Sequence, residues 1–121
     1  MFGLQRPPLL TCEPVLSEAI YLLSRLDRGA ATVFELIRRG VVKVAFRLDE
    51  EIDSVSRIVA KYGPRETDLA DACLVRMSEL HPDSVVLTVD SQFRDVYRRN
   101  GRRVIETLIV DGTSGRRRRG R

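Results

Sequence analysis

The sequence is poor in the residues on which most metal centres and nucleophilic enzymes depend. Its 121 residues include one histidine, two cysteines and no tryptophan. Cys12 and Cys73 form no Cys-x-x-Cys pair, and together with the lone His81 they exclude a zinc site of any usual pattern. We expect both thiols to be small buried side chains, and His81, which precedes Pro82, to lie in a solvated loop.

Long apolar runs are also absent. No segment is long enough to cross a bilayer, and the first ten residues contain no apolar core of a signal peptide, so we expect a cytoplasmic protein without a membrane partner. Hydrophobic residues make up 43% of the chain and charged residues 31%, the balance of a soluble globular protein. The length favours one domain, which we place at residues 1–111.

The positive charge is confined to one end of the chain. The net charge is +4, but residues 112–121, GTSGRRRRGR, contain five arginines and no acid. Subtracting those arginines from the 21 basic residues leaves 16 against 17 acidic residues. We expect a disordered basic tail whose Arg116, Arg117, Arg118 and Arg119 bind nucleic-acid phosphates. The alternative is a solvated tail with no dedicated role.

Strand and helix patterns alternate along the rest of the chain. Short β-branched runs predict strands at 8–12, 41–48, 85–89 and 102–110. Apolar residues at helical spacing predict helices at 14–26, 30–39, 50–62 and 68–80, and a short polar helix or turn leads to Asn100-Gly101. Asp49 is the predicted N-cap of the third helix. The alternation predicts an α/β fold, a three-layer α/β/α arrangement with a parallel central sheet.

Four acids stand beside apolar segments. Glu18 borders the apolar face of the first helix, Asp68 and Asp71 head a largely apolar helix, and Asp90 ends the most apolar strand. Each has a structural explanation: Glu18 could reach water, Asp68 could be the N-cap with Asp71 in an imperfect capping box, and Asp90 could start an Asx-turn. Ligands of open α/β sheets bind at the carboxyl ends of strands, where Asp90 is expected.

The functional alternative joins these acids in one cleft. Carboxylates brought together repel one another unless a cation lies between them, and Mg²⁺ and Mn²⁺ prefer oxygen ligands. Such a metal generates a hydroxide nucleophile and neutralises phosphate charge, so that no nucleophilic side chain is needed. This chemistry suits a chain with one histidine and no evident Ser/His or Cys/His pair.

Three segments together resemble a PIN domain, the fold of many bacterial VapC-type toxin ribonucleases. They are "LLTCEPVLSEAIYLL", "TDLADACLVRMSEL" and "VVLTVDSQF", which occur in the family's order. The resemblance implies an endoribonuclease that uses Mg²⁺ or Mn²⁺. It implies that Glu18, Asp71 and Asp90 ligate or orient the metal and water, with Asp68 as an auxiliary acid or cap. Thr88 would supply a hydroxyl that supports a ligand or contacts phosphate. RNA is the implied substrate, and an antitoxin protein or a second copy of the chain is an implied partner.

The same resemblance predicts an incomplete N-terminus. PIN domains usually begin with a strand that ends in a metal-binding Asp, whereas only MFGLQRPP precedes the first matching strand here. We therefore expect either a late start or a lost strand, and a non-catalytic domain that binds nucleic acid or protein is the alternative function. The absent strand would lie between 9–12 and 85–89. We expect the two halves to pair directly, to borrow a strand from another chain, or to aggregate.

Overall fold

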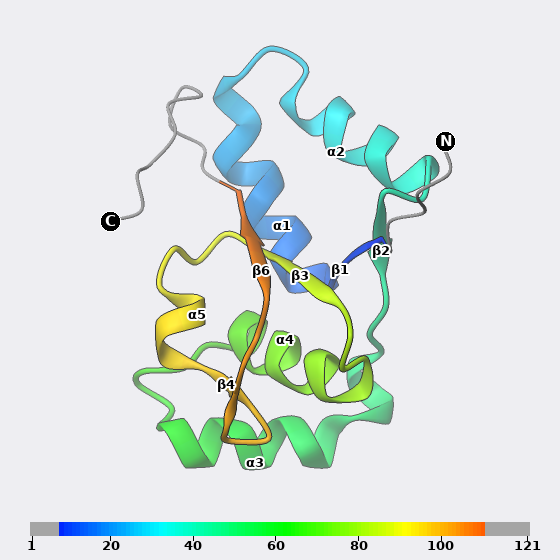
Figure 1. Ribbon diagram of the computed structural model, residues 1–121. Helices are drawn as coiled ribbons and strands as arrows, with labels where there is room; N and C mark the ends of the chain where they lie inside the picture. Colours follow the sequence, from blue (N-terminus) through cyan, green and yellow to red (C-terminus); the bar gives the residue numbers. More distant parts are fainter. Residues whose placement is uncertain (1–7, 111–121) are drawn as a thin grey trace.

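A four-stranded parallel sheet forms the centre of the molecule. The computed structural model describes residues 8–110, and its central sheet has the strand order β2-β1-β3-β6 (Figure 1). All three strand pairs are parallel. The strands are β1 (Leu9–Thr11), β2 (Val42–Val44), β3 (Val85–Thr88) and β6 (Thr107–Ile109). Helices flank this sheet, which confirms the predicted α/β class.

The helices lie close to their predicted positions. They are α1 (Glu13–Leu22), α2 (Gly29–Arg38), α3 (Ile52–Tyr62), α4 (Leu69–Leu80) and the short α5 (Phe93–Val96). The first predicted helix is shorter than expected, because its last turn tightens into a 3₁₀ helix at Leu23–Arg25. Within residues 8–110, no helix is long and apolar enough to cross a membrane.

The two halves of the sheet pair directly with each other. Leu9 and Leu10 of β1 are in register with Val85 and Val86 of β3. The hydroxyl of Thr11 strengthens this junction, since its Oγ1 donates to the Leu87 carbonyl oxygen at 3.1 Å. Of the three outcomes expected for the two halves, the structure adopts direct pairing, and the backbone groups of β1 and β3 find partners in one continuous sheet.

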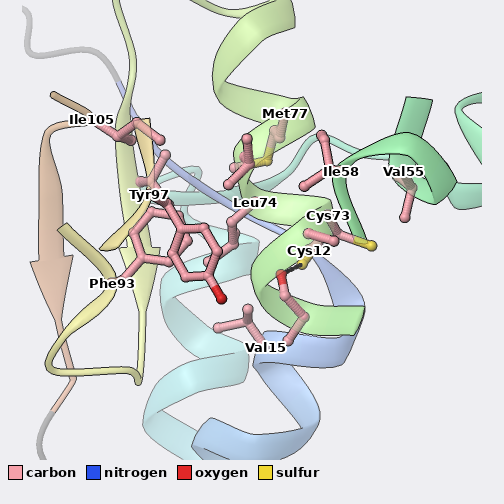
Figure 2. Packing of buried hydrophobic residues seen from close by; sticks show 14 of the residues in the cluster. Cys12, Val15, Val55, Ile58, Cys73, Leu74, Met77, Phe93, Tyr97 and Ile105 are labelled. Carbon is pink, nitrogen blue, oxygen red and sulfur yellow. Dashed lines mark hydrogen bonds between the residues drawn. The ribbon is translucent and has the colours of Figure 1, made fainter. Parts of the chain in front are cut away.

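Helix α4 is the centre of the hydrophobic core. Eight of its twelve residues are buried, and it packs between α1 and α3. Figure 2 shows Leu74 and Met77 of this helix among side chains from several other elements, including Val15 of α1 and Val55 of α3. Both cysteines are buried and unoxidised, as predicted. The broad apolar surface of α4 therefore packs against neighbouring elements on most of its sides.

The prediction of one continuous strand at residues 102–110 is wrong. Residues 102–110 divide into β5 (Arg103–Val104), which pairs antiparallel with β4 (Arg98–Arg99), and β6, which joins the main sheet. The turn between β4 and β5 has positive φ at Asn100 and Gly101, 53° and 74°. Asn-Gly is the pair that favours such a hairpin turn. A hairpin therefore begins where the sequence pattern suggested a loop before one long strand.

The predicted N-cap at Asp49 is also wrong. Residues Leu48–Glu50 form a separate 3₁₀ turn, and α3 starts only after Glu51, whose side chain makes no cap hydrogen bond. Glu51 instead forms an ion pair with Arg76 of α4 at 2.8 Å. The strand before this turn is also shorter than predicted, because β2 ends at Val44. The helix therefore begins two residues later than an Asp49 cap would place it, after a residue whose side chain pairs with α4.

Candidate functional site

The start of α4 presents two acids in different roles. Asp68 is the N-cap residue, and its Oδ1 accepts the Asp71 backbone N–H at 2.9 Å. The structural explanation of Asp68 as a cap is therefore confirmed. Asp71 lies one turn further on and its side chain is buried, with 8% exposed. Its place in the first turn of α4 favours an acid, but burial of the carboxylate is costly.

Asp90 lies at the carboxyl end of β3, as expected. Its Oδ1 accepts the Gln92 N–H at 2.9 Å, so the Asx-turn is also confirmed. Its own N–H donates to the Oγ1 of Thr88, which is buried, at 3.1 Å. One carboxylate oxygen of Asp90 is thus used by the turn, whereas the Thr88 hydroxyl fixes the backbone on which Asp90 stands.

The acids of these elements affect one another's protonation. Burial, followed by the charges of Asp68 and Asp90, raises the pKa of Asp71 to about 7. Partial burial and the same two charges raise the pKa of Glu18, which lies on an exposed part of α1. The charges of Asp68 and Asp90 therefore act on both Asp71 and Glu18, which links the four acids electrostatically. We refer to Glu18, Asp68, Asp71 and Asp90 as the acid site.

Tyr97 is a residue of this site that the sequence analysis missed. It follows α5, is buried, and its hydroxyl lies 3.3 Å from Asp71 Oδ2 and 3.2 Å from Thr67 Oγ1. Burial raises the pKa of Tyr97 to about 12, so the phenol stays protonated and can donate to Asp71. Its ring packs on Phe93 and on Tyr62 with centroids 5.0 and 4.8 Å apart. No motif in the sequence links Tyr97 to an acid 26 residues earlier.

The chemistry of the acid site suits a hard divalent cation. Carboxylates are the ligands that Mg²⁺ and Mn²⁺ prefer, and a cation would relieve the repulsion that raises the pKa of Asp71. Within the part of the chain that the structure describes, no three His, Cys, Asp or Glu side chains lie close enough together to form a metal-binding cluster. Mg²⁺ is usually held by one or two carboxylates and keeps several waters, and Asp71 and Asp90 would be the residues to hold it.

The predicted nucleic-acid contacts of the tail, Arg116, Arg117, Arg118 and Arg119, lie outside the described residues. His81 is exposed at the end of α4, as predicted, and away from the start of that helix where the acids gather.

Comparison with known proteins agrees with the fold. The model of the PIN domain family matches residues 3–99. The chain therefore belongs to the PIN domain family. PIN domains are associated with nuclease activity; they generally use divalent metal ions and commonly bind nucleic acid. Comparisons with curated proteins and with solved structures give no match.

Proposed function

We propose that this protein is a metal-dependent endoribonuclease of the toxin type, which hydrolyses RNA phosphodiesters with carboxylate-bound Mg²⁺ or Mn²⁺. The observation that carries the proposal is the buried Asp71 carboxyl, whose pKa is raised to about 7 by burial and by neighbouring acids. Folding brings these acids together at a cost in stability, which is typical of a functional site. RNA is the proposed substrate, the cytoplasm the proposed location, and an antitoxin or a second copy of the chain the proposed partner.

Each residue has a distinct role in this proposal. Asp71 and Asp90 hold the metal, and Glu18, which lies on α1, orients water. When bound, the metal supplies a hydroxide nucleophile and neutralises charge on the phosphate. Tyr97 donates to Asp71 Oδ2, which would leave Oδ1 to hold a cation. Thr88 fixes the turn that carries Asp90.

The metal site can be tested separately from catalysis. Adding Mn²⁺ to isotopically labelled protein should broaden the amide signals of residues around Asp71 and Asp90 before signals elsewhere. The charge-neutral Asp71→Asn/Asp90→Asn variant should lose this selective broadening, whereas Asp83→Asn, which changes an exposed acid beyond α4, should keep it. Absence of selective broadening at millimolar Mn²⁺ would contradict the metal site.

The activity itself requires a second measurement. The purified chain should cleave single-stranded RNA when Mn²⁺ is added and should stop when a chelator is added in excess. Cleavage that persists with the chelator, or that is equal in Asp90→Asn, would come from a contaminant or from another site.

A non-catalytic PIN domain that binds nucleic acid or protein is the second candidate. It is favoured by the absence of a three-ligand cluster among residues 8–110. Under this alternative, the chain binds RNA with equal affinity in Mn²⁺ and in chelator and leaves the RNA intact.

A further inference from the structure

A second charged region, of opposite sign, lies beside the hairpin. The groove between α3, α4 and the β4–β5 hairpin has a volume of about 210 Å³. Four cations line it, Arg57 and Lys61 of α3, Arg76 of α4 and Arg98 of β4, with Glu79 as the one acid. We call this region the hairpin groove. Figure 1 shows the tip of the hairpin next to α3.

Glu79, the one acid that lines the groove, already has partners within the protein. Arg76 forms ion pairs with Glu51 at 2.8 Å and with Glu79 at 3.1 Å, so its charge is compensated within the protein. The second oxygen of Glu79 accepts the Asn100 backbone N–H at 3.4 Å. Arg57, Lys61 and Arg98 make no ion pair within residues 8–110. Three positive charges therefore face the groove without a negative partner from the described chain.

The hairpin itself concentrates positive charge without benefit to its own folding. Its sequence, RRNGRR at residues 98–103, places Arg99 directly across from Arg103. Like charges directly opposite in a β-ladder destabilise the pair. Arg99 is 8% exposed, and its buried Nε has no hydrogen-bond partner among the described residues. A buried donor without an acceptor costs stability. Arg99 does not line the groove, so it adds positive charge to the hairpin without contacting a ligand bound there.

The approach of α3 to the turn completes the groove. Lys61 Nζ lies 3.0 Å from the position that a Cβ would take at Gly101, so the ammonium rests against the bare backbone of the turn. It also lies 5.3 Å from the centre of the Tyr62 ring. Tyr62 in turn packs against Tyr97, whose hydroxyl reaches Asp71. The groove and the acid site are thus separated by two aromatic rings.

We propose that the hairpin groove binds the phosphodiester backbone of the RNA strand on one side of the bond that the acid site cleaves. This inference rests on the proposed function for the identity of the ligand, and it adds the surface that holds the substrate. Arginine and lysine neutralise successive phosphates without reading sequence, and the groove offers three such cations beside one flat tyrosine ring. An acidic protein segment is the competing ligand of the same charge.

The test measures binding without metal, so that it does not depend on cleavage. Affinity of the full chain for a labelled single-stranded RNA of about 20 nucleotides is measured by fluorescence anisotropy in chelator over a range of salt concentrations. Arg57→Ala/Lys61→Ala should reduce the slope of log K against log salt by about 1.4, taking ~0.7 for each lost phosphate contact. The loss of affinity caused by the double substitution should therefore be about 7 times larger in about 50 mM salt than in about 200 mM salt.

Arg25→Ala/Lys43→Ala is the matched control, since both residues are exposed, outside the groove and without an ion pair among the described residues. It removes the same charge and should leave the slope close to that of the parent. Equal slopes for the two double variants would overturn the groove. The proposal would also be overturned if Arg57→Ala/Lys61→Ala lost binding to a poly-glutamate peptide but kept its binding to RNA. If the parent chain cleaves no RNA in Mn²⁺ but the groove variant still lowers the salt slope, only the proposed function is contradicted.

Discussion

The acid site and the hairpin groove carry opposite charge, although only the edge-to-face pair of Tyr62 and Tyr97 lies between them. In the acid site, Asp68 and Asp71 lie at the start of α4, Asp90 follows β3 and Glu18 lies on α1. Burial and the charges of Asp68 and Asp90 raise the pKa of Asp71. In the hairpin groove, three cations have no acidic partner within residues 8–110. Outside the tail, acids and bases nearly balance in number. A net charge near zero outside the tail is thus compatible with two regions of local excess charge. One is suited to a metal ion and the other to phosphates.

The largest effect should come from removing a proposed metal ligand of the acid site. Asp90→Asn should reduce Mn²⁺-dependent RNA cleavage by about 100-fold or more, because the metal contributes several kcal/mol to stabilising the transition state. Asparagine can still accept the Gln92 N–H, so the turn and the fold should persist. RNA affinity in chelator should not fall, since the groove is untouched.

Asp68→Asn is the control for this first prediction. Asparagine caps helices as well as aspartate does, so the variant should keep both its stability and most of its cleavage activity. A loss in Asp68→Asn as large as that in Asp90→Asn would assign Asp68 to the metal rather than to the cap. Equal cleavage by Asp90→Asn and the parent would contradict the assigned site.

Deleting residues 112–121 should separate the tail from the groove. If all five tail arginines neutralise phosphates, the slope of log K against log salt should fall by up to about 3.5, at ~0.7 for each contact. The groove variant should then lower the slope further by the same amount as in the full chain, because the two regions bind different phosphates. Cleavage at saturating RNA should not change. An unchanged slope after deletion would show that the tail takes no part in binding.

Much of the fold follows from sequence because it depends on local periodicity. Helix α4 and strand β3 are continuous apolar segments with clear ends, and both lie within two residues of their predicted limits. The hairpin was not predicted, since its strands have two residues each and their pairing depends on the Asn100-Gly101 turn. The four acids of the candidate site could be singled out from sequence because acids beside apolar segments are unusual, and their functional role stays a prediction.

The rest of the site depends on tertiary contacts that leave no local pattern. Tyr97 reads as one aromatic residue in a polar segment, and only packing against Phe93 and Tyr62 brings its hydroxyl to Asp71. The hairpin groove was missed for the same reason, since Arg57 and Lys61 are ordinary surface residues of α3 until the hairpin lies beside them.

The charge of Asp71 should make stability depend on pH in the absence of metal. Its carboxyl pKa rises from 3.8 to about 7 on folding. The folded state therefore binds more protons between these values, and the free energy of unfolding should fall as pH rises from about 4 to 7, by about 2 kcal/mol or more. Above pH 7 this contribution should level off. Thermal unfolding across this pH range, in chelator, measures the effect.

Asp71→Asn should abolish most of that pH dependence and melt at a higher temperature than the parent at pH 8. Mn²⁺ should stabilise the parent and leave the variant unchanged. A parent and variant with parallel pH profiles would mean that Asp71 titrates normally, and the acid site would then lack the repulsion that distinguishes it from the hairpin groove.

The smallest effect should come from Tyr97→Phe, which changes the link between the two regions without altering any charge. The variant keeps the ring contacts with Phe93 and Tyr62 but removes the hydroxyl beside Asp71 Oδ2. Removing a partner that orients a metal ligand typically costs 10–100-fold, and we expect about 10-fold weaker Mn²⁺ binding here. The pH at which stability levels off should rise, because the hydroxyl lowers the pKa of Asp71. A purely structural role would lower the melting temperature while leaving Mn²⁺ affinity and the pH profile as in the parent. Tyr62→Phe, which loses only a hydroxyl near the Arg98 N–H, is the matched control and should leave both unchanged.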